Sequence, residues 1–586
     1  MRLLSQKSGA ARWIGPALLG LAPLWLIGAF DRGLWTPDEP RVADIDWRMA
    51  FQRHWTLPQL AGRPFLEKPP LSYWASALCV RLLGNTPDAL RVPNLLYALI
   101  VALAIGALGF AMDGPGAALV AAWVAGSALT ALRVSMWLAP DACLLAACAV
   151  ALLGAYLGYQ APPGRRKLCG YTLMHAGAAA GFMAKSAVGW LVPGLTLLTL
   201  IAWERRWHEL KRLELYAGFL LQALVIAPWL LAVTRTAHGL QALRVMFWYN
   251  LAGRFMRIAA PPAYQYANGH RNTFGKYFLW LPVYLLPWTA LAVAAARRAW
   301  ERARLGIAAA TPWRFATAAA LPWLALLSLA ATARDIYAAP ALLGFALLVG
   351  LWAAETQRLR TGGHYALIWT RVTVALLAAA FTLAVLTLAP ARPGAPGGAF
   401  GDLAFAAAVP IGTAWALKQA VREHRRRWII GSFAWTYAAF AVAFCLGAIA
   451  IFPAIDRGQN LQALAQRIHA QTRRDRLALL NPDETTVAML DRGLLTRVTR
   501  LRAPAGAVGR TVAHWFAAQG PAARVLVLLP GHAAGPFTPL LQRLDLWHRA
   551  GDGEAGHLQS AGVAVIAHRY DLPQGRRYAL LAPPGS

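Results

Sequence analysis

The sequence predicts a multi-pass α-helical membrane protein with a small α/β domain at its C-terminal end. Hydrophobic residues make up 58% of the 586-residue chain and charged residues only 14%, which is too apolar for an ordinary soluble protein. Many apolar runs reach about 20 residues, the length that a helix needs to cross a bilayer. After Pro453 the pattern changes to a polar helix and short apolar runs at 524–529 and 562–567, which are typical of buried strands.

The apolar runs divide into about thirteen spans. The first follows the basic residues Arg2, Lys7 and Arg12 and resembles a signal sequence, but its length and the absence of a small-residue cleavage motif favour a retained span. The predicted spans are 13–30, 91–111, 116–134, 141–159, 169–184, 186–203, 214–233, 277–296, 313–331, 336–354, 368–389, 403–418 and 429–452.

Basic residues indicate how the chain is oriented. The 57 Lys+Arg against 26 Asp+Glu could suggest nucleic-acid binding, but no motif supports that partner, and basic residues of membrane proteins gather in cytoplasmic loops. If the N-terminus is cytoplasmic, each even-numbered span returns to a basic loop, and an odd number of spans places the C-terminus outside. We therefore predict a bacterial inner-membrane protein with a periplasmic C-terminus that contacts membrane lipids. The basic loops contain Arg165, Arg166 and Lys167; Arg205, Arg206, Lys211 and Arg212; Arg297, Arg298, Arg302 and Arg304; Arg358 and Arg360; and Lys418, Arg422, Arg425, Arg426 and Arg427.

This topology divides the chain into a transmembrane domain, 1–454, and a soluble periplasmic domain, 455–586. Two outer loops, about 31–90 and about 234–276, join spans of the first domain and carry charged residues to one side of the membrane. Chemistry is expected on that outer side.

The loop 31–90 contains an acidic pair, Asp38 and Glu39, followed by Arg41. Such acids can simply stabilise a helix start, and that alternative stays open. The residues that follow have apolar positions at helical spacing, which predicts a helix lying on the bilayer surface with its polar face toward the acids. The apolar positions are Val42, Ile45 and Met49.

Three further charged positions belong to the same outer side. Glu67 and Lys68 precede two prolines, which present them on an extended backbone, although an ordinary surface ion pair would look the same. Asp141 lies at the mouth of a span, where a carboxylate is costly unless it is paired, functional or a helix cap. Lys185 lies between two apolar runs, where it could bind a partner or extend to the interface.

The second outer loop and its neighbours add cations and aromatic residues that could form a pocket for a phosphate head group. Sugar transfer would suit such a cluster, since a carboxylate stabilises positive charge at the anomeric carbon and Lys or Arg stabilises the leaving phosphate. His270 can equally be structural. The residues of this group are Arg254, His270, Arg271, Tyr277, Arg334 and Tyr337.

The ordered motifs resemble the GT-C lipid-linked sugar transferases. W-x-P-D-E-x-R at 35–41, F-L-E-K-P-P at 65–70 and the isolated Asp141 are similar to the subgroup that places 4-amino-4-deoxy-L-arabinose on lipid A, which is related to protein O-mannosyltransferases. The resemblance continues through GFMAKSAVGWLVP (181–193), APWLLA (227–232), FWYNLAGRF (247–255), LLPW (285–288) and ARDIYAAPAL (333–342).

The resemblance implies a GT-C-like fold, a sugar donor on polyprenyl phosphate and a periplasmic acceptor, lipid A or another. Asp38 and Asp141, with Glu39 and Glu67 beside them, would be the acidic active-site residues, while Arg41, Lys68 and Arg254 would hold the donor phosphate. The resemblance implies no definite cofactor. A divalent metal is left open, with Glu67 and His270 as candidate ligands, and Asn250 and Leu251 stand where the subgroup tends to carry an acid and a histidine.

We therefore predict a membrane glycosyltransferase. One alternative is a lipid or sugar transporter, which would carry charges deep within its spans and would consist of two related halves. Another is a protein O-glycosyltransferase. A relative that only binds the carrier lipid is a third possibility.

Overall fold

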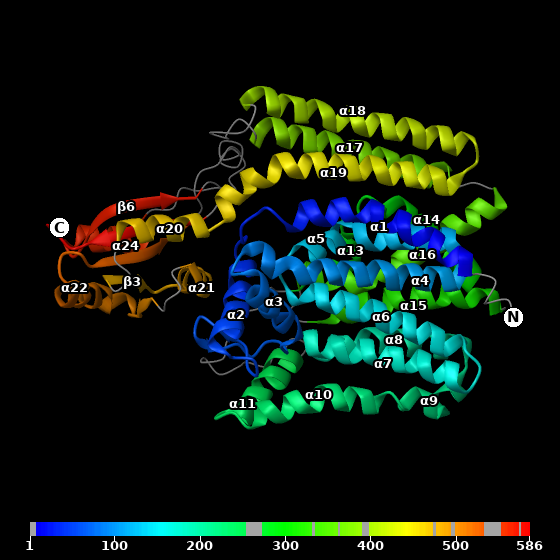
Figure 1. The fold of residues 1–586 in the computed structure, drawn as a ribbon, viewed down its shortest axis with the longest axis horizontal. Coiled ribbons are helices and arrows are strands. Elements are labelled where there is room, and N and C mark those ends of the chain that lie inside the picture. The colour runs from blue at the N-terminus through cyan, green and yellow to red at the C-terminus, as the bar shows by residue number, and fades with distance from the viewer. Residues whose placement is uncertain are drawn as a thin grey trace.

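A computed structural model describes residues 7–253, 272–306, 308–330, 334–360, 364–388, 398–472, 476–493, 498–531, 552–572 and 576–585. Its helices lie side by side in one bundle, and a smaller unit of helices and strands adjoins one end of that bundle (Figure 1). The N-terminal helix begins at the end of the bundle far from this C-terminal unit. Helix α2 (Asp38–Gln52) lies at the end of the bundle that adjoins the C-terminal unit, and α11 (Gly239–Arg244) lies at a corner of the same end.

The bundle is built mainly of long apolar helices. Short 3₁₀ or π segments, η1 (Trp207–Lys211), η2 (Val245–Ala252), η4 (Ala308–Ala310) and η5 (Asp335–Ala338), join some of them. The helices are α1 (Lys7–Ala29), α2 (Asp38–Gln52), α3 (Leu71–Leu83), α4 (Pro87–Ser127), α5 (Leu129–Met136), α6 (Pro140–Gln160), α7 (Arg165–Lys185), α8 (Val188–Glu204), α9 (Leu213–Tyr216), α10 (Phe219–Thr234), α11 (Gly239–Arg244), α13 (Lys276–Tyr284), α14 (Thr289–Ala303), α15 (Thr311–Leu329), α16 (Ala339–Leu359), α17 (His364–Leu388), α18 (Gly398–Arg425) and α19 (Ile429–Gln459).

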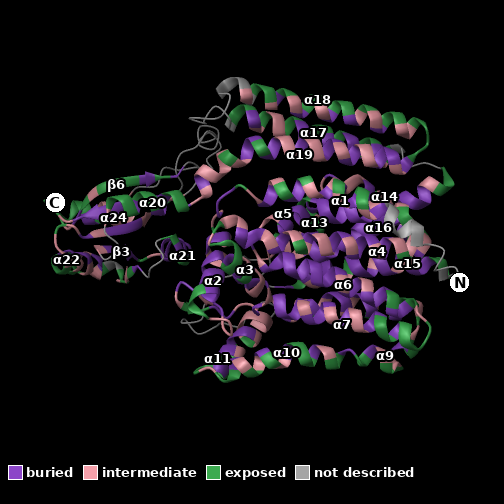
Figure 2. Cartoon of the chain, in the orientation of Figure 1, coloured by how far each residue is buried: buried purple, intermediate pink, exposed green. Residues whose placement is uncertain are grey.

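Six stretches of the described chain are long and apolar enough to cross a membrane, and the bent pair α13 and α14 would make a seventh. Three further apolar helices are shorter, Trp13–Ala29, Leu71–Leu83 and Val188–Glu204. Within α4 the backbone leaves helical geometry at Asp113 and Gly114, between the two spans predicted there. The span count of about thirteen stays a prediction. Buried residues concentrate in central helices such as α6 and α16, whereas α10 and α17 expose more of their surface (Figure 2).

Helix α2 corrects one expectation. The sequence predicts its apolar face on the bilayer surface, but Ile45 and Met49 are buried in a protein core that they share with Leu464, Leu479 and other residues of the C-terminal unit. Hydrophobic periodicity indicates that one face of a helix is buried, but it does not distinguish burial in lipid from burial against protein. Helix α2 is thus held between the bundle and the C-terminal unit. A two-stranded hairpin, β1 (Gln59–Leu60) with β2 (Arg63–Pro64), follows it.

The C-terminal unit is built on a five-stranded sheet of order β4-β3-β5-β7-β6. Strand β3 pairs in parallel with β4 and β5, and β7 pairs antiparallel with β5 and β6. Alternate residues of β3 face opposite sides: Leu477 and Leu479 join the core that includes α2, while Ala478 and Leu480 join a second core with α22 (Val508–Gln519) and α24 (Gly553–Ser560). Its elements are α20 (Gln462–Gln471), β3 (Leu477–Leu480), α21 (Glu484–Gly493), β4 (Thr499–Leu501), η8 (Ala505–Ala507), α22 (Val508–Gln519), β5 (Arg524–Leu529), α24 (Gly553–Ser560), β6 (Val565–Asp571) and β7 (Arg577–Ala582).

Candidate active site

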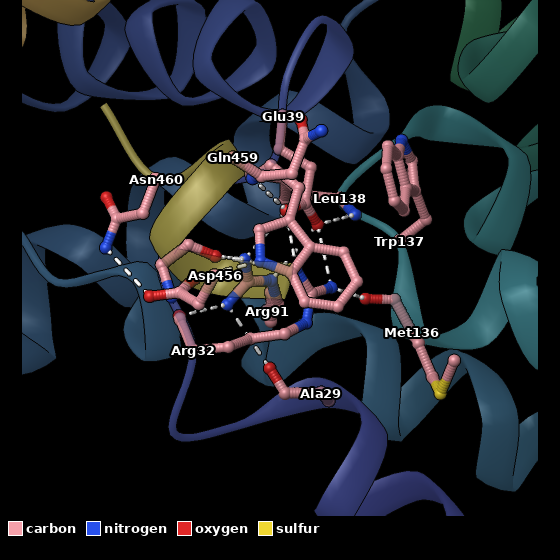
Figure 3. Close-up of polar contacts among 12 residues, drawn as sticks. Ala29, Arg32, Glu39, Arg91, Met136, Trp137, Leu138, Asp456, Gln459 and Asn460 are labelled. Carbon is pink, nitrogen blue, oxygen red and sulfur yellow. Dashed lines mark hydrogen bonds and ion pairs between the residues drawn. The ribbon is translucent and has the colours of Figure 1, made fainter. Parts of the chain in front are cut away.

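A buried ionic cluster around Glu39 anchors the outer loop (Figure 3). Arg32 donates to both carboxylate oxygens of Glu39 at 2.7 and 3.0 Å, and Arg91 donates from Nη2 at 2.8 Å. The backbone N–H groups of Trp35 and Leu138 also donate to Glu39, at 2.7 and 3.0 Å. Burial by itself would raise the pKa of Glu39, but the charges of Arg91 and Arg32 lower it to about 2.

This setting changes the expectation for Glu39. The sequence predicts it as a catalytic acid beside Asp38, but its side chain has no exposed surface and both oxygens are fully engaged. We therefore assign Glu39 to holding the loop in place. Asp456, near the end of α19, supports the same loop by accepting from the Gly33 N–H at 2.7 Å and from the Trp35 indole at 2.9 Å.

Asp38 points to a different neighbour. Its two oxygens accept from Arg334, at 3.3 Å from Nη1 and 2.6 Å from Nη2. Arg41 lies 4.0 Å from Asp38 and donates to Glu484 of the C-terminal unit at 2.7 Å. Tyr277, predicted as a supporting residue, donates its hydroxyl to the Arg334 carbonyl at 2.9 Å and so holds the backbone of that arginine. The structure thus brings Arg334 from a distant part of the sequence to Asp38, which lies one helical turn before Arg41.

Asp141 and Lys185 form a second pair. Helix α6 has no side-chain cap at its start, and Asp141 instead accepts a hydrogen bond from the Lys185 ammonium group. That nitrogen also lies 3.7 Å from the centre of the Tyr337 ring. The Lys185 side chain is only 10% exposed and turns to Asp141 rather than to the interface. The capping and interface alternatives therefore do not describe these two residues.

A cavity opens beside this pair, and about 700 Å³ of empty space lies within it and its solvent-filled mouth. Among the residues that the structure describes, Lys68 has no acid within salt-bridge distance, although its charge acts on Asp141. Asn250 donates to the Leu66 carbonyl at 2.9 Å and so fixes the backbone next to Glu67. The lining consists of Glu67, Lys68, Leu144, Lys185, Ser186, Val188, Met246, Asn250, Leu251, Trp323, Leu327, Ala330 and Tyr337.

Ser186 is a cavity residue that sequence reasoning missed. Its backbone has φ +59°, a left-handed conformation that costs a non-glycine residue energy. Its hydroxyl is buried and has no hydrogen-bond partner within the described part of the chain. An unpaired buried hydroxyl on a strained backbone is a candidate ligand for substrate. Its only signal in the sequence is its place directly after Lys185.

Several predicted residues cannot be placed. Arg254, His270 and Arg271 lie outside the described residues. Across the described ranges, no group of three His, Cys, Asp or Glu side chains is arranged to hold a metal ion. Asn250 and Leu251 line the cavity, and neither supplies an acidic or imidazole ligand. Of the two candidate ligands, Glu67 lies at the cavity and His270 lies outside the described residues, and no step of the proposed reaction uses a metal.

Comparisons with known proteins identify similar sequences and a similar fold. Residues 67–231 match the family described as dolichyl-phosphate-mannose-protein mannosyltransferase. The chain is 31% identical over 354 residues to an undecaprenyl phosphate-α-4-amino-4-deoxy-L-arabinose arabinosyl transferase of Pseudomonas aeruginosa, covering 60% of this chain and 61% of that protein. The similarly named protein of Edwardsiella ictaluri is 30% identical over 46% of this chain and 47% of its own length. The matched segment thus spans about three fifths of the Pseudomonas relative.

A solved structure decides the fold. ArnT from Cupriavidus metallidurans, bound to undecaprenyl phosphate, superposes with a TM-score of 0.69 over 97% of this chain and 98% of that one, at 16% identity. The chain has the ArnT fold. An archaeal oligosaccharyltransferase, AglB from Archaeoglobus fulgidus, is more distant, with a TM-score of 0.50 over 89% of this chain and 69% of its own. The resemblance to GT-C transferases predicted from the motifs is confirmed. In this ArnT-like fold, the motif residues Lys68 and Lys185 lie at one cavity.

Proposed function

We propose that the protein is a membrane glycosyltransferase that moves a sugar from a polyprenyl-phosphate donor to a periplasmic acceptor. The observation that carries the proposal is Lys68, a cation without a salt-bridge partner among the described residues, in a cavity beside the Asp141–Lys185 pair. An ammonium group in such a site favours a phosphate. The ArnT fold and the names of the relatives make undecaprenyl-phosphate-linked aminoarabinose the first donor to test.

The reaction forms one bond and breaks another. An acceptor oxygen attacks the anomeric carbon of the sugar, the bond from that carbon to the phosphate oxygen breaks, and the electron pair leaves with polyprenyl phosphate. Lys68 stabilises the negative charge that develops on this phosphate. We assign the stabilisation of positive charge on the sugar ring to the carboxylates of Asp38 and Asp141.

The pairing of the two acids favours one class of acceptor. Arg334 binds both oxygens of Asp38, and Lys185 is bonded to Asp141, so each carboxylate already has a cationic partner in place of an acceptor hydroxyl. An acceptor that is already anionic, such as a phosphate of lipid A, needs no base. A protein hydroxyl would need one, so we place protein O-glycosylation second.

The same proposal includes the topology. We infer about thirteen spans, a cytoplasmic N-terminus and a C-terminal unit in the periplasm, in a bacterial inner membrane. The alternation of basic loops supports this orientation. In this orientation the cavity, α2 and the C-terminal unit lie on the periplasmic side, where nucleotide sugars are absent and a lipid-linked donor is required.

The test is sugar transfer by purified protein. Wild type is expected to release undecaprenyl phosphate and glycosylate lipid A, and Asp38→Asn and Asp141→Asn are expected to be slower by about a hundredfold. Full turnover in both variants would rule out the proposed site. Movement of the donor across vesicles with no glycosylated product would instead favour the transporter alternative.

A further inference from the structure

Helices α2 and α21 are joined by two ion pairs at matching positions. Arg41 Nη2 lies 2.7 Å from Glu484, and Arg48 Nη2 lies 2.7 Å from Asp491. The partners are seven residues apart on both helices, from 41 to 48 and from 484 to 491, which is about two helical turns. The two helices therefore run in the same direction. The Arg41–Glu484 pair lies beside Asp38, and the Arg48–Asp491 pair lies about two turns farther along both helices.

The two pairs differ in how they are built. The side chains of Arg48 and Asp491 are only 4% and 1% exposed, and Asp491 also accepts from Arg500 at 2.9 Å. In contrast, the side chains of Arg41 and Glu484 are 26% and 51% exposed. A buried, multiply bonded pair is costly to break, whereas an exposed pair contributes little and exchanges partners readily. The Arg48–Asp491 pair thus keeps α2 and α21 docked when the Arg41–Glu484 pair opens.

Arg41 is also incompletely satisfied. Its Nε is buried and has no hydrogen-bond partner in the described ranges, and its Nη1 lies 4.0 Å from Asp38. Beyond Asp38, its nearby anion is Glu484, which comes from a different unit of the chain. A guanidinium group with spare donors beside an exposed carboxylate can exchange that carboxylate for a phosphate.

We propose that Glu484 is a positioning residue that occupies Arg41 in the empty site and is displaced by the phosphate of a lipid substrate. The proposal rests on the proposed function, because it takes Arg41 to be a phosphate ligand. It adds a contribution of the C-terminal unit: α21 supplies a competing anion, and this competition lowers the affinity of the site for phosphate. The phosphate can belong to the polyprenyl donor or to the lipid acceptor.

The experiment measures equilibrium binding of undecaprenyl phosphate, and separately of lipid A, to the full-length protein in detergent. Glu484→Gln removes the competing charge and keeps the shape, so one of the two ligands should bind about two- to fivefold more tightly. Glu484→Asp should return the affinity toward that of wild type. Glu554→Gln is the matched control, because it removes one carboxylate from the same unit, where Glu554 bonds to Asn481, and it should change neither affinity.

A double-mutant cycle tests the route through Arg41. Arg41→Ala should weaken binding by about tenfold, and in that background Glu484→Gln should have no further effect. The inference would be overturned if Glu484→Gln bound both ligands with unchanged or lower affinity than wild type. It would also be overturned if Glu484→Gln still raised the affinity in the Arg41→Ala background. If wild type transfers sugar while the inference fails, the proposed function still stands. If wild type neither binds nor transfers, the proposed function itself is wrong.

Discussion

Arg334 binds Asp38 through two hydrogen bonds although 296 positions separate them in the chain. Asp38 begins α2, and Arg334 directly precedes η5, which also carries Tyr337 of the cavity. The pair therefore joins the outer loop to the later half of the bundle at the edge of the cavity. Its planar, two-point geometry positions the Asp38 carboxylate as well as neutralising it.

Arg334→Lys is expected to lower kcat/KM by about tenfold, because lysine keeps the charge and loses the second hydrogen bond. Steady-state transfer kinetics measure the effect, and Arg358→Lys on the opposite side of the bundle serves as a control, since Arg358 pairs with Asp113 away from the cavity. Wild-type kinetics in Arg334→Lys would show that the two-point contact does not matter.

The Asp141–Lys185 pair allows stability to be separated from chemistry. Asp141→Asn leaves a buried lysine unpaired, so the protein should lose about 3 kcal/mol of stability together with activity. Asp141→Leu combined with Lys185→Met removes both charges and should recover much of the thermal stability while transfer stays about a hundredfold low. Recovery of transfer in the double variant would mean that the pair serves folding alone.

Ser186 can be tested by comparing two substitutions. Ser186→Gly removes the hydroxyl and the backbone strain, so stability should rise by about 1 kcal/mol. Ser186→Ala removes the hydroxyl and keeps the strain. If the hydroxyl binds substrate, both variants should lose about fivefold in kcat/KM, since one neutral hydrogen bond contributes about 1 kcal/mol. A loss in only one of them would point to the backbone.

The lowered pKa of Glu39 makes the stability of the protein depend on pH. Its pKa in the folded protein is about 2, against 4.5 ordinarily, because Arg91 and Arg32 outweigh the effect of burial. A carboxyl with a lowered folded pKa stabilises the protein above its ordinary pKa and loses that contribution as the pH falls toward the folded value. The contribution is about 3 kcal/mol and should be lost between about pH 5 and pH 2.

Thermal unfolding of the purified protein measures this effect. Wild type should lose stability over that interval, whereas Glu39→Gln should be less stable at neutral pH and should show a smaller decline. Parallel curves for the two proteins would mean that other carboxyls dominate the acid response.

Apolar runs made part of the fold predictable. The run 524–529 coincides with β5, and the predicted break between two spans near 113 is where α4 leaves helical geometry. The strand follows from a local run of apolar residues, and the break in α4 falls at Asp113 and Gly114 between two apolar runs. The partner of the α2 apolar face was not predictable, because it is the C-terminal unit, which lies more than 400 residues away in the chain, and periodicity carries no information about partners.

The site was predictable only as a group of residues. The topology and the motifs placed Asp38, Lys68, Asp141 and Arg334 on one side of the membrane, and the structure brings them near one cavity. They could not separate Asp38 from Glu39, because successive residues of a helix point about 100° apart and only packing decides which of them is buried. Ser186 and Glu484 carry no motif, so only their three-dimensional neighbours reveal them.

Lys68 gives the most direct test of the central claim that this cavity takes the phosphate of a lipid-linked sugar. The measurement is mass spectrometry of lipid A from a bacterium that makes the undecaprenyl-phosphate-linked aminoarabinose donor, lacks its own transferase and expresses this chain. Wild type should add the amino sugar to lipid A, and Lys68→Ala, present in the membrane at an equal level, should not. Unmodified lipid A with wild type, or equal modification with Lys68→Ala, would contradict the account.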